Sequence, residues 1–173
     1  MDKRTQTCCF TGHRHLPAGE EEAIWQRAQE HLIPLLEQGV RYFGVGGALG
    51  FDTLVAEKLL DLRRQYPQIR VILVLPFRGY QSRWTAAQQA RAARIESRVD
   101  KVVYCCDAPS REAFLARDRH LVDGSACLLC PTRTPPVFVR RPAGNMSLIW
   151  KSNKLFAAKG TCYDKQVPFA FPY

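Results

Sequence analysis

Five short apolar runs alternate with four segments of helical spacing along the first 130 residues. The apolar runs, each typical of a strand, are 7–12, 42–47, 70–77, 101–106 and 126–130. The segments with helical spacing are 20–38, 52–65, 82–98 and 110–122, and we expect Pro34 to kink or break the first of them. Near-continuous apolar runs favour strands that are covered on both faces. The pattern therefore predicts an α/β fold: a Rossmann-like, doubly wound, mostly parallel sheet of five strands or slightly more, with helices on both faces.

The composition changes abruptly near Cys130. Residues 131–173 hold six of the 11 prolines and seven Lys or Arg against one Asp, so most of the net charge of +9 lies there. We predict a domain core over 1–130 and a basic, proline-containing C-terminal segment over 131–173, packed on the same domain. Either this segment is a rewritten tail, or the reading frame slipped near residue 131.

Hydropathy and cysteine usage indicate a cytoplasmic protein. No apolar run approaches the ~20 residues that a membrane span needs, and the first residues lack the apolar stretch of a signal peptide. The seven cysteines give no sign of a disulfide framework, and we expect them to be small buried hydrophobes. Cys127 and Cys130 have the spacing of metal ligands, but they lie in a strand-like run without a second pair, so we expect no metal site.

Three glycines connect the second strand to the second helix. Ligands in doubly wound folds bind beyond the carboxyl ends of the strands. Gly46, Gly47 and Gly50 lie at such an end, and glycines before a helix let backbone N–H groups approach a phosphate. The turn either binds an anion or is merely tight. Asp52 either caps the helix or accepts a hydrogen bond from a ribose hydroxyl.

The loop after the first strand offers further candidates. Gly12 supplies a turn, His13 can donate to a ligand oxygen, and Arg14 carries a planar fork suited to phosphate or carboxylate.

Aromatic and charged residues follow two other strands. Phe77, Tyr80 and Trp84 either wall a base or sugar or simply pack in their loop. Arg117 and Asp118 either face a ligand or form an ordinary surface ion pair.

Four ordered motifs, "FTGHR", "GGALGFD", "LPF" with a downstream "SRW", and "RDRHLVDGSA", resemble the YpsA-like branch of the SLOG superfamily. That superfamily unites the DNA-binding protein DprA/Smf with the LOG phosphoribohydrolases. The resemblance covers roughly residues 7–130 and implies a Rossmann-like fold with a pocket for a nucleotide-like small molecule. The pocket residues that it implies are Gly12, His13, Arg14, Gly46, Gly47, Gly50 and Asp52, with Trp84, Arg117 and Asp123 at further family positions. The chain departs from the family in lacking a Gly-Gly-Thr segment after the fifth strand.

Three functions follow, of which the first is favoured. It is a ligand-binding or sensor protein for a nucleotide-derived molecule such as ADP-ribose, NAD or a nucleoside phosphate, which needs no cofactor. The resemblance links this function to bacterial cell division and stress.

The alternative is a LOG-like nucleotide N-glycosidase. Its chemistry needs carboxylates that stabilise an oxocarbenium-like centre and protonate the leaving base, and the candidates are Asp52 and Asp123. The Pro-Gly-Gly-x-Gly-Thr-x-x-Glu element of those enzymes is absent from the sequence, so binding is favoured over catalysis.

A second alternative is DprA-like binding of single-stranded nucleic acid. The basic tail interleaves Phe138, Trp150, Phe156 and Tyr163 with its charges, which suits phosphate contacts combined with base stacking. The other interpretation is that these aromatic residues pack on the sheet. A homo-oligomer is compatible with either, because exposed helix faces in such folds often pair.

Overall fold

The computed structural model describes residues 2–130, 137–140, 148–151 and 154–157. A short 3-10 helix, Lys3–Gln6, precedes the first strand. The main strands are β1 (Thr7–Phe10), β2 (Tyr42–Val45), β3 (Arg70–Leu75), β4 (Lys101–Tyr104) and β5 (Cys127–Cys130). The helices between them are α1 (Glu21–Glu37), α2 (Phe51–Leu62), α3 (Ala86–Glu96) and α4 (Arg111–Asp123). The predicted β/α alternation is therefore confirmed.

The strands form one sheet in the order β4-β3-β2-β1-β5-β6. The first five are parallel, and β6 (Val137–Arg140) adds to β5 in the antiparallel direction. Successive strands run outward from β1 to β4, and the chain then crosses back to place β5 on the other side of β1. This reversal makes the fold doubly wound, as predicted, and ligands in such sheets bind beside the reversal at the carboxyl ends of the strands.

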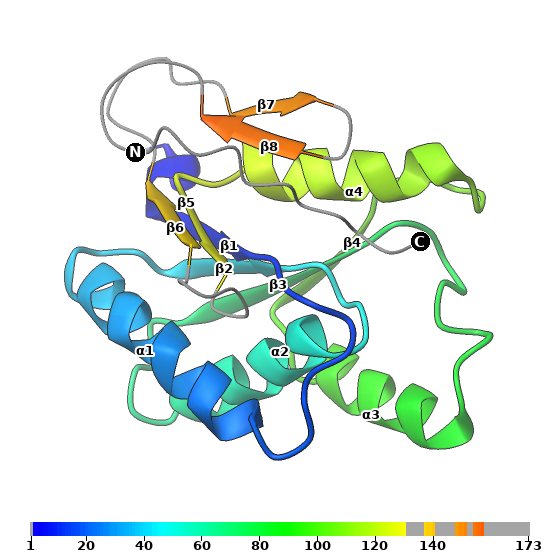
Figure 1. The fold of residues 1–173 in the computed structure, drawn as a ribbon, viewed down its shortest axis with the longest axis horizontal. Coiled ribbons are helices and arrows are strands. Elements are labelled where there is room, and N and C mark those ends of the chain that lie inside the picture. Colours follow the sequence, from blue (N-terminus) through cyan, green and yellow to red (C-terminus); the bar gives the residue numbers. More distant parts are fainter. Residues whose placement is uncertain (1, 131–136, 141–147, 152–153, 158–173) are drawn as a thin grey trace.

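Helices cover both faces of the sheet, three on one and one on the other (Figure 1). Helices α1, α2 and α3 pack over the larger core, in which Phe43, Val45 and Val71 of the sheet are fully buried. Helix α4 covers a smaller core on the opposite face, where Leu121 and Val122 contact apolar side chains of the sheet. Because both faces are covered, the strands read as continuous apolar runs.

Two helix predictions need correction in detail. Helix α1 does not break at Pro34 but continues through it to Glu37, and a kink there stays a prediction. Helix α3 begins at Ala86, four residues later than predicted, because the Thr85 side chain accepts from Gln88 N–H while Gln88 reaches back to the Thr85 N–H. This capping box fixes the start of the helix, and leaves 77–84 as a loop at the edge of the sheet.

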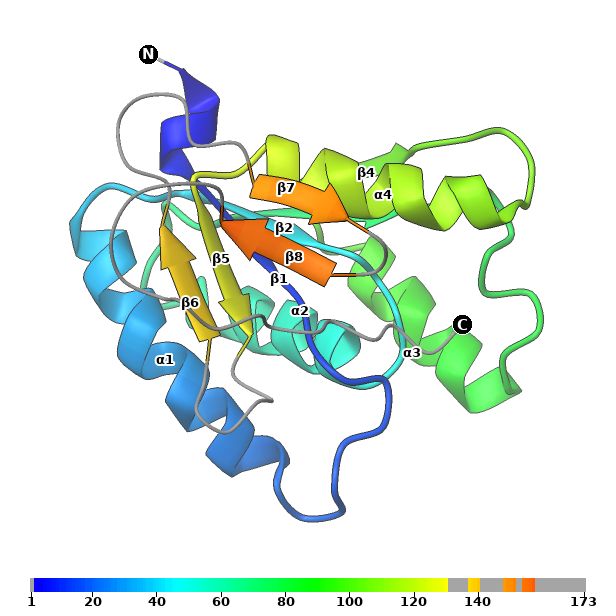
Figure 2. The same cartoon turned by 45° about the horizontal axis from the view of Figure 1, so that its top comes forward.

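The C-terminal segment contributes backbone strands. Besides β6, strands β7 (Leu148–Lys151) and β8 (Lys154–Ala157) form an antiparallel hairpin that lies beside α4 (Figure 2). Phe138, Trp150 and Phe156 fall in β6, β7 and β8, whereas Tyr163 lies outside the described residues. Among the described helices, none has the length and apolar character needed to span a membrane.

Candidate functional site

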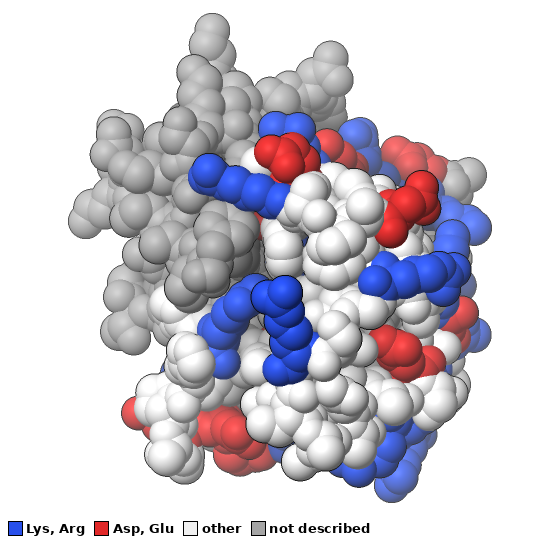
Figure 3. Space-filling model, turned by 90° about the vertical axis from the view of Figure 1, so that its right-hand side faces the viewer, with Lys and Arg blue, Asp and Glu red and all other residues white. Residues whose placement is uncertain are grey.

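The predicted site residues follow the carboxyl ends of β1, β2 and β3, which point to the same edge of the sheet (Figure 1). Gly12, His13 and Arg14 follow β1, Gly46 and Gly47 follow β2, and the loop 77–84 follows β3. Figure 3 faces this side of the molecule, where Lys and Arg side chains cross an otherwise uncharged surface and further charged side chains of both signs lie around it.

A buried charge network lies at the centre of this edge and consists of Arg117, Asp52 and Asp118. Their side chains are only 5%, 9% and 8% exposed. The Nη1 atom of Arg117 donates to the carbonyl oxygen of Gly46 at 2.8 Å and lies 3.7 Å from Oδ2 of Asp52. Its Nε atom lies 2.7 Å from Oδ1 of Asp118, a close ion pair in which the N–H is not aligned for a hydrogen bond. The pair is therefore not the surface ion pair considered from the sequence.

The network joins the two helix layers. Arg117 and Asp118 lie in α4 on one face of the sheet, whereas Asp52 lies in the first turn of α2 on the other. The guanidinium thus crosses the end of β2 to reach its partners. Since all of its described contacts are internal, Arg117 fixes the geometry of the edge, and its predicted contact with a ligand remains a prediction.

Burial makes ionisation of both carboxyl groups of the network less favourable than in water. Burial raises the pKa of Asp118 from 3.8 to about 6, against the opposing effect of Arg117. Burial also raises the pKa of Asp52, while Arg117 and the Ala48 N–H act to lower it. The cause is desolvation of the charged form, which one shared guanidinium offsets only in part.

Asp52 is not the N-cap of α2, which corrects one of its two predicted roles. The N-cap position is occupied by Gly50. The Asp52 carboxylate instead accepts a hydrogen bond from the N–H of Ala48 at 3.2 Å, and the Thr53 hydroxyl donates to the Ala48 carbonyl at 2.7 Å. These two bonds fold the glycine turn back onto the helix. The contact of Asp52 with a ribose remains a prediction.

The glycines of the turn are required by packing. A Cβ atom at Gly46 would overlap Nη1 of Arg117 and come within 2.7 Å of Oδ2 of Asp52. At Gly47, where φ is +66°, it would lie 2.5 Å from Cδ2 of Leu75. These contacts explain the glycines without a ligand.

The loop after β1 packs onto the same turn. Gly50, at φ +78°, lies against the carbonyl groups of His13 and Arg14, and the Phe51 N–H donates to the His13 carbonyl at 3.0 Å. Gly12 has no room for a Cβ atom because the Phe51 ring lies against it. The first two loops are therefore one packed unit. His13 itself has an exposed side chain.

An aromatic cluster borders the charge network and consists of Phe77, Tyr80, Trp84 and Phe114. The Tyr80 ring contacts the other three edge-on, with centroids 5.4 to 5.9 Å apart. All four residues are half-buried. Three of them were candidates from the sequence, and Phe114, in the first turns of α4, was missed. Helix α4 begins at the same edge of the sheet because it follows the parallel strand β4.

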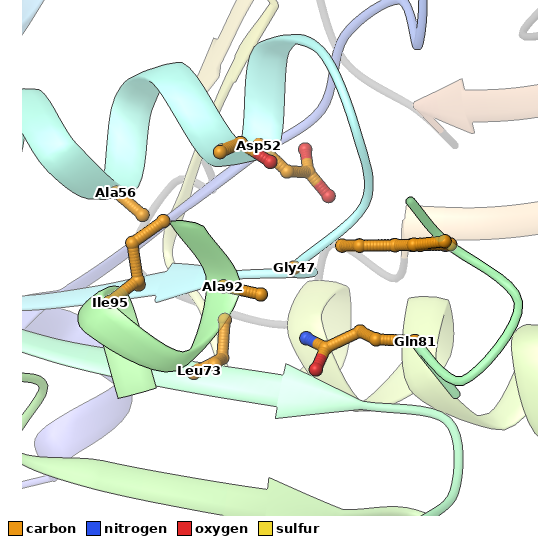
Figure 4. A pocket seen from close by; sticks show the side chains of 9 residues that line it. Gly47, Asp52, Ala56, Leu73, Gln81, Ala92 and Ile95 are labelled. Atoms are coloured by element: carbon orange, nitrogen blue, oxygen red, sulfur yellow. The ribbon is translucent and has the colours of Figure 1, made fainter. Parts of the chain in front are cut away.

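A narrow pocket lies between α2, α3 and the loop 77–84. In Figure 4, Asp52 and Gln81 lie toward one end, while Ala56 and Ile95 form the other with Leu73 and Ala92 beside them. Trp84 and Thr53 also line it. Its cavity volume of about 10 Å³ is room for a single water molecule. A larger ligand would therefore rest on the mouth of this pocket rather than inside it.

The two carboxylates predicted for catalysis are not brought together. Asp123 is the last residue of α4 and is exposed. It lies six residues beyond Arg117, which is about 9 Å along a helix axis. The second buried carboxyl group of the edge is Asp118, which was not among the predicted catalytic residues. The sequence signal for the burial of Asp118 was helical spacing. Arg117 and Asp118 lie in α4 between Ala113 and Leu121, which are themselves buried.

The profile of the YpsA family, described as the YspA SLOG family, matches residues 10–131, which include both loops and the charge network. The chain belongs to this family.

Two similar proteins carry the name UPF0398 protein. The UPF0398 protein of Listeria monocytogenes serotype 4a is 26% identical over 129 residues, covering 69% of this chain and 71% of the relative. The UPF0398 protein of Oenococcus oeni is 29% identical over 112 residues, covering 60% and 57%.

One solved structure is similar in part. It is the structure of DNA processing protein A from Helicobacter pylori, which was described for the single-stranded DNA binding mode of that protein. The TM-score is 0.47 with 19% identity, over 72% of this chain and 52% of that one.

Proposed function

We propose that the protein is a cytoplasmic binding or sensor protein for a nucleotide-derived small molecule, such as AMP, NAD or ADP-ribose. The observation that carries this proposal is the meeting of an aromatic cluster and a rigid charge network at one edge of the sheet. A nucleotide needs a flat apolar surface for its base and polar groups for its sugar and phosphate. Membership of the SLOG family supports the same ligand class.

The binding mode follows from the mouth of the pocket. Trp84 lines the pocket and contacts Tyr80 at a centroid distance of 5.4 Å, so it is the candidate to stack on a base. Asp52 lines the same pocket across from the loop 77–84 and is the candidate acceptor for a ribose hydroxyl. Ligand contacts of the glycine turn itself are not needed for this mode.

The test is a thermal-shift screen against AMP, NAD, ADP-ribose, a cyclic dinucleotide and a short oligonucleotide. A ligand at about 100 times its Kd adds roughly 2.7 kcal/mol of stability, which is a shift of several degrees for a chain of this size. Trp84→Ala should weaken binding roughly 5- to 150-fold, since stacking on one base contributes about 1–3 kcal/mol. Tyr104→Ala is the control, because Tyr104 is a half-buried aromatic residue at the end of β4 that pairs with Arg78 instead.

Three outcomes separate the candidate functions. A shift from one small nucleotide that Trp84→Ala loses and Tyr104→Ala keeps supports the proposal. A shift only from the oligonucleotide, falling steeply as salt rises, favours nucleic-acid binding. If no compound in the screen changes the melting temperature, the proposal is wrong.

A second candidate is the N-glycosidase, favoured by the two buried carboxyl groups with raised pKa values. A carboxyl group that titrates near pH 6, such as Asp118, suits general acid chemistry at neutral pH. The test is release of free base from a nucleoside monophosphate, compared with Asp52→Asn and Asp118→Asn. Release that survives both substitutions would contradict this mechanism.

A further inference from the structure

Two polar groups at the site have no hydrogen-bond or ion-pair partner among the described residues. Arg14 is half-buried in the loop after β1, and Tyr80 is half-buried in the loop after β3. Within the described part of the chain, neither the Arg14 guanidinium nor the Tyr80 hydroxyl has a hydrogen bond or ion pair. Arg117, by contrast, donates a hydrogen bond to the Gly46 carbonyl and forms ion pairs with Asp52 and Asp118.

Arg14 and Tyr80 lie in loops that follow β1 and β3, which end at the same edge of the sheet. Burial raises the pKa of the Tyr80 hydroxyl, and Arg14 is the charged group that most opposes this shift. Arg117, Asp52 and Asp118 have smaller effects on Tyr80. Arg14 also acts on Asp52 and Asp118, although less than Arg117 does. The charge of Arg14 therefore acts both on a member of the aromatic cluster and on the charge network.

The glycine turn has fewer free N–H donors for an anion than its sequence suggests. The Ala48 N–H donates to the Asp52 carboxylate, and the Phe51 N–H at the start of α2 donates to the His13 carbonyl. Two donors that a phosphate would use are thus occupied. An ionised Asp52 next to the turn would also repel an anion.

We infer that Arg14 and Tyr80, rather than the glycine turn, bind the phosphate of the nucleotide-like ligand. The inference rests on the proposed function and specifies how the ligand's charge is recognised. Arginine presents a planar fork that makes paired, charge-assisted hydrogen bonds to phosphate oxygens. The tyrosine hydroxyl, which is protonated at neutral pH, adds a third donor. The ring of Tyr80 meanwhile remains in contact with Trp84, so base and phosphate sites adjoin.

The experiment compares AMP with adenosine, which share a base and sugar and differ only in the phosphate. Calorimetric titrations are made on the wild-type protein, Arg14→Gln, Arg14→Lys and Tyr80→Phe. The control is Arg83→Gln, an exposed arginine in the loop 77–84. Melting temperatures without ligand show whether each variant is folded.

The wild-type protein should bind AMP about 10- to 100-fold more tightly than adenosine, the range expected for charge-assisted hydrogen bonds. Arg14→Gln should remove most of this preference, and Arg14→Lys should retain part of it because the charge remains without the fork. Tyr80→Phe should reduce AMP affinity about three- to tenfold and leave adenosine affinity unchanged. Arg83→Gln should behave like the wild type.

The inference is overturned if folded Arg14→Gln and Tyr80→Phe keep the full preference for AMP, or if the wild-type protein has none. If the inference fails in either way but the protein binds adenosine, the proposed function still stands. If AMP, NAD, ADP-ribose and adenosine all fail to bind, the proposed function fails and this inference fails with it.

Discussion

At the scale of single residues, the close packing around Gly46 makes this glycine sensitive to substitution. In Gly46→Ala the added methyl group must displace the Arg117 guanidinium or the Asp52 carboxylate. Overpacking of this kind costs about 1–3 kcal/mol, and the melting temperature should fall by roughly 2–12 °C. Gly19→Ala is the control, because no atom lies within 4 Å of its Cβ position and only the positive φ of +81° is strained. A Gly46→Ala melting temperature equal to that of the wild type would show that the network tolerates displacement.

Asp118 should make stability depend on pH. Its folded pKa of about 6 lies above the unfolded value of 3.8, so the folded state binds more protons between these values. The stability that this group contributes is therefore fully present below pH 4 and is lost as pH rises through 6. Asparagine has no such loss. The free energy of unfolding of Asp118→Asn, relative to wild type, should rise by about 2 kcal/mol from pH 4 to pH 7, measured by urea denaturation. A relative stability that falls with pH would mean that Arg117 outweighs burial.

At the scale of elements, Pro34 is exposed within a continuous α1. A proline inside a helix removes one backbone hydrogen bond and costs about 3 kcal/mol relative to alanine, less the entropy that it removes from the unfolded chain. Pro34→Ala should therefore stabilise the protein by about 1–2 kcal/mol. The exposed Glu37→Ala in the same helix should change stability by less than about 0.5 kcal/mol. Chemical denaturation of both variants checks this, and destabilisation by Pro34→Ala would show that the proline has a packing role.

Elements were predictable where periodicity and burial agree. The strands are apolar throughout because helices cover both faces, so their order along the chain was visible in the sequence. The start of α3 was missed although its capping box, Thr85 with Gln88, is written in the sequence. The continuity of α1 through Pro34 was not predictable, because packing of Leu32, Leu35 and Leu36 into the core outweighs the local cost.

The site was only partly predictable for a related reason. The sequence placed Arg14, Asp52 and Trp84 at the correct edge, because parallel strands end together. It could not show that Arg117 and Asp118 are buried, since an adjacent Arg–Asp pair on a helix is usually solvated. Nor could it show that neighbouring side chains fill the space beside the glycines, because those neighbours come from distant segments.

At the scale of the whole molecule, stability should be graded across the sheet. Strand β2 is central, with Phe43 and Val45 fully buried, whereas the residues of the edge strand β4 are exposed or half-buried. Local opening needs the least free energy where little apolar surface is buried. Amides of β2 should therefore exchange with deuterium more slowly than those of β4, as measured by mass spectrometry of peptic peptides. Equal protection of both strands would indicate that the sheet opens only as a unit.

The antiparallel strand β6 has a practical consequence for anyone who shortens the chain. The family match ends at residue 131, which suggests Cys130 as a convenient point of truncation. Yet β5 pairs with β6 along all four of its residues, and Cys127–Cys130 is buried throughout. A protein cut there would present a bare row of backbone donors and acceptors on an apolar strand with two thiols. Such an edge recruits strands from other molecules, so the shortened domain should precipitate or oligomerise where the full chain does not.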